Sequence, residues 1–297
     1  MIPHGTILGG VSVVPDLAAG LAAYQGTLQL DLLHRGPLPA DLAAAWGCPA
    51  SAGRAHAVLR PKSGAPCWFR LVEQPDVAGF KPTTSFGWGA FELTVQDVFG
   101  WPDRLAGSAF TIVGEPKQLP GMDAFVPMQA LGPGQEMIYL NQVFANMDTL
   151  DLPKAASITD HIFIVILATP DRAATCRWYA DRLDLDLGPV FELPYQMINT
   201  AFGLPDDFIT ALQMVGKGRM PIVEVDDYPP QTIVRPRHDG MLPPGNALVT
   251  LAMRDLDACD VAWISPPVRR DGPLYDGRRA GCVIGPAGEL LELVELG

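Results

Sequence analysis

The last stretch of the chain, GPAGELLELVE at residues 285–295, combines a tight turn with an amphipathic strand. Glycine and proline open it, as in many turns, and the side chains that follow alternate between two faces. Leu291 and Leu293 therefore face one way, and Glu292 faces the other. Residues 132–141, GPGQEMIYLN, repeat this pattern. The chain thus contains two copies of one turn-and-strand ending.

Four strand-and-helix openings accompany these endings. Each is an apolar run that leads to an aspartate, which can accept the free N–H groups of a following helix. The runs are LGGVSVVPD (8–16), FELTVQD (91–97), IFIVILATPD (162–171) and LVTLAMRD (248–255), and the helices predicted after them span 18–27, 98–105, 172–183 and 256–264. The aspartates recur at roughly 75 to 85 residues, the length of one supersecondary unit.

Strand patterns follow each predicted helix. They lie at 56–60 and 68–73, at 110–113 and 137–140, at 209–215 and 222–225, and at 281–284 and 290–294. The order of strand, helix and further strands thus occurs four times. This predicts an α+β protein made of four βαβββ modules.

The ending at residues 285–295 resembles the D-P-D-G-n-x-I-E-L ending of the glyoxalase/bleomycin-resistance/extradiol-dioxygenase proteins, the vicinal oxygen chelate superfamily. Gly285 and Gly132 stand where that family usually has Asp. The resemblance implies that two βαβββ modules pair into a cupped mixed sheet around one site. We therefore expect two such domains, at residues 1–148 and 157–297, with Phe144–Ser157 as the linker.

Composition narrows the class of protein. The 297 residues are 48% hydrophobic and 18% charged, as in a globular chain with a sizeable core. The net charge of −12, with no run of Lys and Arg, argues against a nucleic-acid partner. No apolar run reaches the length of a membrane span, and no secretory signal opens the chain. The five cysteines form no CxxC pair, which is typical of reduced thiols in a cytoplasmic protein.

In the resembling family, each module can offer one side chain from its first strand and one from its last. Counting seven residues back from the capping aspartates gives Gly9 and Ala90 in the N-terminal domain, and the last strands offer Arg70 and Tyr139. This set suits no catalytic metal. We therefore expect the N-terminal domain to be structural, or to bind an anionic or phenolic ligand through Arg70 and Tyr139.

The C-terminal domain offers more ligands. Its last strands carry Glu224 and Glu292, and its first strand opens at Asp160-His161, which resembles the Asp-His opening of many family members. His161 reaches the ligand position only if residues 167–169 lengthen the loop before the helix, and otherwise Ile164 takes that position. The set His161, Glu224 and Glu292 would suit one divalent Fe, Mn, Ni or Zn ion. Without a metal, the two carboxylates would repel, and the pKa of one would rise, giving a general acid or base.

Two further segments are candidates for binding a substrate. Arg235, Arg237 and His238 lie close together in an acidic chain and could clamp a carboxylate, or they could form a solvated loop. Tyr195 and Asn199 lie in an apolar, aromatic stretch that predicts a pocket wall or ordinary core.

The favoured function is a small-molecule enzyme with lyase or isomerase chemistry on an oxygenated organic acid or aromatic, with Glu224 or Glu292 moving the proton. One alternative is a metal-free binding protein like the bleomycin-resistance members, in which Trp68, Trp88 and Trp178 would stack on a planar ligand. Another is an extradiol-type dioxygenase, although the second histidine of that pattern is missing. The sequence is compatible with a homodimer and with a monomer.

Overall fold

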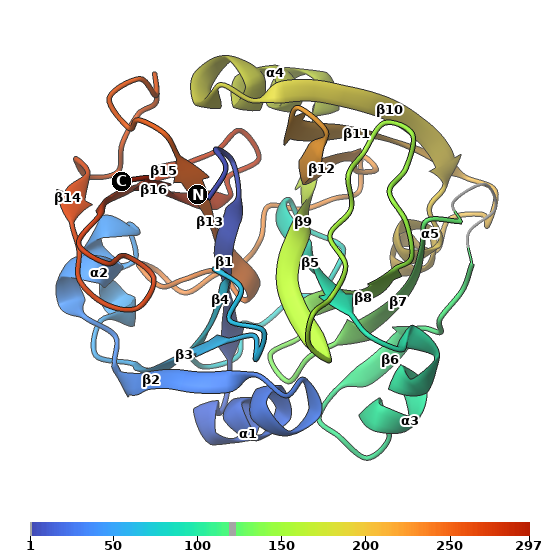
Figure 1. Ribbon diagram of the computed structural model, residues 1–297, viewed down its shortest axis with the longest axis horizontal. Coiled ribbons are helices and arrows are strands. Elements are labelled where there is room, and N and C mark those ends of the chain that lie inside the picture. The colour runs from blue at the N-terminus through green and yellow to red at the C-terminus, as the bar shows by residue number, and fades with distance from the viewer. Residues whose placement is uncertain (1, 119–122) are drawn as a thin grey trace.

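The computed structural model describes residues 2–118 and 123–297, which form two eight-stranded sheets lying side by side (Figure 1). The strand order of the first sheet is β14-β15-β16-β13-β1-β4-β3-β2. The order of the second sheet is β10-β11-β12-β9-β5-β8-β7-β6. The predicted four modules are present, and each begins with a long apolar strand at the centre of its sheet.

The modules follow one another along the chain. Module one contains β1 (Ile7–Val14), α1 (Leu17–Ala22), η1 (Ala23–Thr27), β2 (Asp31–Pro37), α2 (Ala40–Ala45), η2 (Pro49–Ser51), β3 (Ala55–Arg60) and β4 (Trp68–Glu73). Module two contains β5 (Gly87–Val95), η3 (Val98–Gly100), α3 (Trp101–Leu105), β6 (Thr111–Gly114), β7 (Phe125–Leu131) and β8 (Met137–Val143). Module three contains β9 (Thr159–Thr169), α4 (Arg172–Leu183), β10 (Asp186–Pro194), α5 (Gln196–Phe202), β11 (Ile209–Lys217) and β12 (Met220–Asp227). Module four contains β13 (Gly245–Met253), β14 (Val268–Arg269), β15 (Arg279–Ile284) and β16 (Leu290–Glu295).

Local capping explains where the helices begin. The carboxylate of Asp16 accepts the N–H groups at the start of α1, and that of Asp171 accepts the N–H of Ala174 in α4. The helix predicted at 256–264 does not form. Residues 256–258 form a bend and a turn, and only the end of the segment lies along β15, where Trp263 bridges to Val283 and the N–H of Ile264 donates to the carbonyl of Cys282 at 2.9 Å.

The pairing of the modules differs from the prediction. β1 pairs antiparallel with β13, so modules one and four share the first sheet. β5 pairs antiparallel with β9, so modules two and three share the second. The expectation that residues 1–148 and 157–297 would each close their own cupped sheet was therefore wrong. Each sheet takes one module from each half of the chain.

The two sheets pack closely around one apolar core. Val14, Phe91 and Leu251, from strands of both sheets, are buried in the same cluster of side chains. A Cβ added at Gly10 on β1 would lie 2.5 Å from the ring of Phe91 on β5, so a glycine is required where these strands approach. The indole N–H of Trp88 donates to the carbonyl of Leu290 at 2.8 Å, which joins the second sheet to the first.

Two matching tyrosine–glutamate hydrogen bonds also cross between the sheets. The hydroxyl of Tyr24 donates to Glu136 at 2.8 Å, and that of Tyr179 donates to Glu289 at 2.7 Å. Each glutamate carboxylate fills the turn before a last strand, where a Cβ on Gly285 would overlap the carboxylate of Glu289. This explains why glycine replaces the Asp of the resembling family at 132 and 285.

These buried glutamates predict that stability depends on pH. Burial raises the pKa of Glu136 and of Glu289 to about 7 from the ordinary 4.5. The folded state therefore holds protons that the unfolded state releases, so the stabilisation is complete below pH 4.5 and is lost as the pH rises through about 7. Each group contributes about 3 kcal/mol at most to this loss.

The variant Glu289→Gln isolates this effect, because a glutamine imitates the protonated acid. We expect its free energy of unfolding to fall less than that of the wild type between about pH 5 and pH 8, in urea titrations at each pH. Equal pH slopes for the two proteins would show that Glu289 titrates normally.

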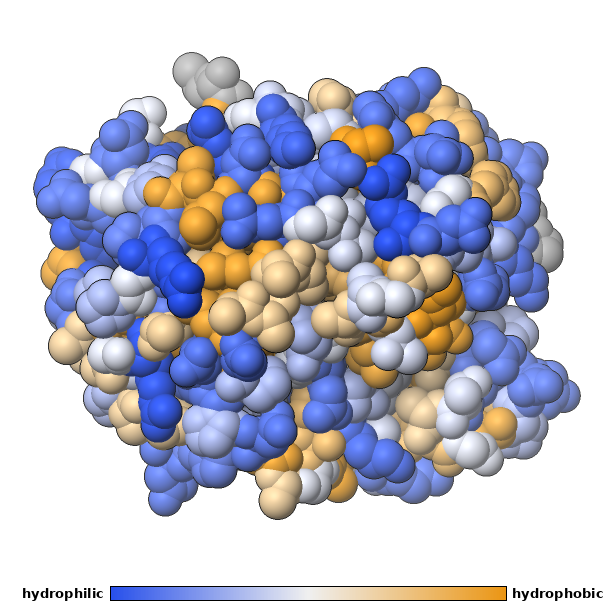
Figure 2. Space-filling model, turned by 90° about the horizontal axis from the view of Figure 1, so that it is seen from below, coloured by the Kyte–Doolittle hydropathy of each residue, from blue (hydrophilic) through white to orange (hydrophobic). Residues whose placement is uncertain are grey.

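Most of the surface seen from below is hydrophilic, with apolar side chains gathered in small patches (Figure 2). No helix in the described parts of the chain is long and apolar enough to cross a membrane.

Candidate active site

The concave face of the second sheet brings together four positions from four central strands. Glu92 on β5 lies opposite Tyr139 on β8, and Ile166 on β9 lies opposite Glu224 on β12. In parallel strands, residues in direct register point to the same face. The last-strand residues Tyr139 and Glu224 are the ones predicted, but the first-strand residues are not.

The first-strand positions lie two residues later than predicted. Glu92 takes the place expected for Ala90, and Ile166 takes the place expected for Ile164. The same shift holds in the first sheet, where Val11 lies opposite Arg70 instead of Gly9, and Thr250 lies opposite Glu292. Glu92 was therefore missed. Counting five residues back from each aspartate, instead of seven, finds it.

A cavity of about 1150 Å³ opens over Glu92, Tyr139 and Glu224, and on β9 it is lined by the predicted Ile164 and not by Ile166. Its polar side is formed by Glu92, Tyr139, Asn141, Tyr195 and Glu224. Its walls are mostly apolar and include Phe125, Leu131, Met147, Leu150, Leu152, Phe163, Ile164, Phe191, Leu193, Met197, Leu212 and Met214. Part of the predicted linker thus forms cavity wall. A space of this size and composition suits a small organic molecule.

A chain of hydrogen bonds orders the polar side of the cavity. Tyr195, which directly precedes α5, donates its phenol proton to Glu224 at 3.0 Å. The hydroxyl of Tyr139 lies 3.2 Å from that of Tyr195. The amide nitrogen of Asn141 donates to Glu92 at 2.9 Å. Each carboxylate is therefore held by a neighbour from a different strand or helix.

The two carboxyl groups of the cavity have raised pKa values. Burial raises the pKa of Glu224 to about 7, although the hydrogen bond from Tyr195 opposes this shift. Burial also raises the pKa of Glu92 well above its ordinary value, and the charge of Glu224 raises it further. Near neutral pH, Glu224 can therefore both accept and return a proton, while Glu92 keeps its own.

Several acceptors beside this pair have no hydrogen-bond partner in the part of the chain that the structure describes. They are the side-chain oxygen of Asn141 and both carboxylate oxygens of Asp226. Both residues are fully buried, and Asp226 lies two residues after Glu224 on the same face of β12. Burial raises the pKa of Asp226, followed by the charges of Glu224 and Glu92. Asn141 and Asp226 were not predicted, although the alternation of strand side chains places them beside Tyr139 and Glu224.

The corresponding face of the first sheet is filled by side chains. Arg70 and Glu292 are both buried there, and Tyr275 connects them by accepting from Arg70 at 3.0 Å and donating to Glu292 at 2.7 Å. Trp46 and Thr250 donate to Glu292 as well, each at 2.8 Å. The guanidinium lies 5.3 Å from the ring of Trp46 and 5.0 Å from that of Tyr275. This face therefore forms a closed polar core and not a binding cavity.

The predicted ligand set is divided between the two sheets. Glu224 lies in the second sheet and Glu292 in the first, so the expected shared site of His161, Glu224 and Glu292 was wrong. His161 lies near the start of β9, where its Nδ1 is 3.3 Å from Asp160, and it does not line the cavity. Arg70 and Tyr139 are likewise in different sheets, so they form no common ligand site.

Of the predicted substrate-binding residues, only Tyr195 lines the cavity. Arg235 donates to Ser85 and to the carbonyls of Trp88 and Asn246, and so joins parts of both sheets. Burial lowers its pKa to about 10.

The other predicted binding residues also lie elsewhere. Arg237 and His238 are exposed, and a ring nitrogen of His238 lies 3.1 Å from the carbonyl of Asp76. Asn199 is buried and donates to the carbonyls of Asp206 and Phe208, which fixes the loop after α5. The expected clamp for a carboxylate in this region is therefore not part of the cavity.

The side chains of the cavity do not match the His and Glu metal ligands that the family resemblance implies. An isoleucine and a phenol occupy two of the four central positions. Within residues 2–118 and 123–297, no group of three or more His, Cys, Asp and Glu side chains is placed to hold a metal ion. Catalytic metals usually take at least three protein ligands. The carboxyl and phenol groups of the cavity can themselves transfer protons and donate hydrogen bonds.

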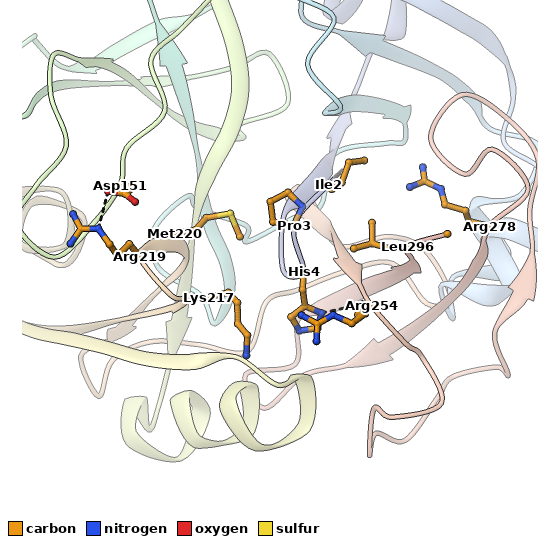
Figure 3. Close-up of a pocket in the computed structure, with 11 residues that line it drawn as sticks. Ile2, Pro3, His4, Asp151, Lys217, Arg219, Met220, Arg254, Arg278 and Leu296 are labelled. Carbon is orange, nitrogen blue, oxygen red and sulfur yellow. Dashed lines mark hydrogen bonds and ion pairs between the residues drawn. The ribbon is translucent and has the colours of Figure 1, made fainter.

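A second cavity, of about 890 Å³, lies where the start of the chain meets β11, β12 and the last residues (Figure 3). It is lined by His4, Lys217, Arg219, Arg254 and Arg278. Its basic groups do not converge, because Arg219 and Arg278 lie at opposite ends in Figure 3. Arg219 and Lys217 are also paired with aspartates, at 2.9 and 3.0 Å. The first cavity is the better candidate for a site.

Comparison with known proteins supports the fold. No protein-family model and no curated protein matches the sequence. Glyoxalase I from Zea mays is similar over 98% of this chain and 92% of that chain, with 17% identity and a TM-score of 0.61. A protein from Bacillus subtilis described as a "putative dioxygenase" is similar over 99% of this chain and 86% of that chain, with 10% identity and a TM-score of 0.62. The chain has the vicinal oxygen chelate fold, as predicted.

Proposed function

We propose that this protein is a small-molecule enzyme that moves a proton on a bound substrate, as an isomerase or a lyase. The observation that supports this most is the carboxyl of Glu224, which lines a large cavity, is oriented by Tyr195 and has a pKa raised to about 7. An acid whose pKa lies near the working pH is an efficient proton carrier.

In this mechanism, Glu224 takes a proton from a carbon next to a substrate carbonyl. The electrons of the C–H bond form the enolate. Once protonated, Glu224 can donate to Tyr195 and Tyr195 can donate to Tyr139, which frees the phenol proton of Tyr139 for a hydrogen bond to the enolate oxygen. An isomerase returns the proton to another carbon, and a lyase expels a leaving group from the enolate. Tyr195 keeps the carboxylate of Glu224 in position through its hydrogen bond. Glu292, the other predicted proton carrier, lies in the closed core of the first sheet and takes no part in this mechanism.

The test is hydrogen exchange in heavy water. The protein is incubated with a panel of small ketones that have aromatic or aliphatic bodies, and deuterium incorporation beside the carbonyl is followed by NMR. We expect at least one ketone to exchange faster with the protein than without it. If every ketone in the panel that binds exchanges at the uncatalysed rate, proton transfer is not the function.

A metal-free binding protein is the second candidate, because apolar side chains form most of the cavity wall. The predicted stacking residues are not the ones present. Trp68 and Trp88 are buried in the core, and Trp178 packs on Tyr179, whereas Phe163 and Phe191 line the cavity. Recovery of a bound, chemically unchanged ligand would favour this candidate.

The dioxygenase alternative has less support. Its pattern requires two histidines and one carboxylate, and no histidine lines the cavity in the described residues.

A further inference from the structure

When Glu92 is ionised, the polar side of the cavity has more hydrogen-bond acceptors than donors. Because the nitrogen of Asn141 donates to one oxygen of Glu92, the side-chain oxygen of Asn141 is held close to that carboxyl group. That oxygen is buried and has no partner in the described residues. Buried acceptors are normally satisfied, so this pair of groups is suited to a ligand that donates protons.

The charges around this point have one sign. The charge of Glu224 raises the pKa of Glu92, and the charges of Glu224 and Glu92 raise the pKa of Asp226. The cationic residues among the described lining are Lys81 and Lys117, and both are exposed at the rim. An anionic group placed beside Glu92 would meet no positive charge there, whereas a cation would stabilise the ionised form of Glu92 over the protonated form that it otherwise holds near neutral pH.

The walls of the cavity also suit an organic cation. Phe163, Phe191 and the rings of Tyr139 and Tyr195 border the same space. Aromatic rings favour organic cations through their electron-rich faces and accept apolar groups as well. The cavity thus combines a carboxyl and amide-oxygen corner with apolar, aromatic sides.

We propose that the cavity binds an amphipathic organic cation, with its ammonium group between Glu92 and the side-chain oxygen of Asn141 and its apolar body against the aromatic walls. This inference builds on the proposed function, because it takes the same cavity and leaves Glu224 as the proton carrier beside the ammonium group. It replaces the organic acid of the sequence prediction with an amine-bearing substrate.

The test compares three probes that share one body: phenylbutylamine, phenylbutanol and phenylbutyrate. Calorimetry on the full-length protein at neutral pH should give the order amine, alcohol, carboxylate, with the amine at least about tenfold tighter than the alcohol. The amine should also release protons, measured by repeating the titration in buffers of different ionisation enthalpy, because it favours the charged form of Glu92. The titrating groups that face Glu92 are Glu224, Asp226, Tyr139 and Tyr195.

Two variants test whether the carboxyl group of Glu92 binds the ammonium group. In Glu92→Gln the preference for the amine should disappear while the alcohol binds as before, which also shows that the variant is folded. Glu192→Gln is the matched control, because Glu192 is exposed on β10 between two wall residues. Equal binding of amine and alcohol by the wild type, tighter binding of phenylbutyrate, or an unchanged preference in Glu92→Gln would overturn the inference.

This test is independent of the proposed reaction. If the protein prefers the amine but catalyses no deuterium exchange, the proposed proton transfer is refuted and the proposed cationic ligand is supported. If it catalyses exchange on ketones but does not prefer the amine, the proton transfer is supported and the cationic ligand is refuted.

Discussion

Replacing Glu224 by glutamine is expected to slow the exchange of substrate protons by about 100- to 10,000-fold, the usual contribution of a general base. Glutamine keeps the size of the side chain and its ability to accept from Tyr195 at 3.0 Å. It removes only the ability to hold and return a proton. The binding of a substrate should therefore change much less than its exchange rate.

The measurement is the rate of deuterium incorporation into the fastest ketone of the panel, at saturating ketone. Glu192→Gln serves again as the control, because it removes a carboxylate from an exposed position on β10, in the same sheet, and should exchange at the wild-type rate. An exchange rate in Glu224→Gln within about twofold of the wild type would remove Glu224 from the mechanism.

Replacing Arg70 by methionine is expected to lower the free energy of unfolding by about 3 to 5 kcal/mol, as when one partner of a buried ion pair is removed. Arg70 and Glu292 are both buried and are joined through the hydroxyl of Tyr275. Without the guanidinium, the negative charge of Glu292 would remain in the closed core of the first sheet. Methionine keeps most of the packing between Trp46 and Tyr275.

A double-mutant cycle separates charge from packing. The double variant Arg70→Met with Glu292→Gln carries no buried charge at this position. It should therefore be destabilised by clearly less than the sum of the two single variants, in urea unfolding at neutral pH. Additive losses, or a loss of under about 1 kcal/mol in Arg70→Met, would show that the two charges do not depend on each other.

The repeated modules could be predicted from the sequence because they depend on local patterns. The capping of α1 by Asp16 and of α4 by Asp171 follows from nearest neighbours, and the last strands follow from alternating side chains. The edge strands β2, β10 and β14 and the inner strand β7 were missed. Residues of β2 and β10 are largely exposed, so the apolar alternation that marks a strand is weak in them.

The pairing of the modules could not be predicted in this way. All four first strands are apolar and nearly fully buried, so each could pair with any other. What distinguishes the partners is contact between remote residues. The hydrogen bonds of Tyr24 to Glu136 and of Tyr179 to Glu289 cross between the sheets, and their sequence separations are 112 and 110 residues.

The site was predicted in part for the same reason. Glu224 and Tyr195 were found because a last strand and an aromatic stretch are visible locally. Glu92 was missed because a parallel register decides which residue of β5 lies opposite Tyr139. Glu292 was placed in the site because its module was paired with the wrong partner.

The proposed enzyme requires that the cavity of the second sheet hold a carboxyl group able to exchange a proton near neutral pH. The most direct measurement is a pH titration of protein labelled with carbon-13 at the glutamate carboxyl groups, followed by NMR, with Glu224→Gln used to assign the Glu224 signal. We predict a pKa of about 7 for Glu224. A pKa near the ordinary 4.5 would mean that Glu224 is a permanently charged carboxylate at neutral pH, and would contradict both the effect of its burial and its role as the proton carrier.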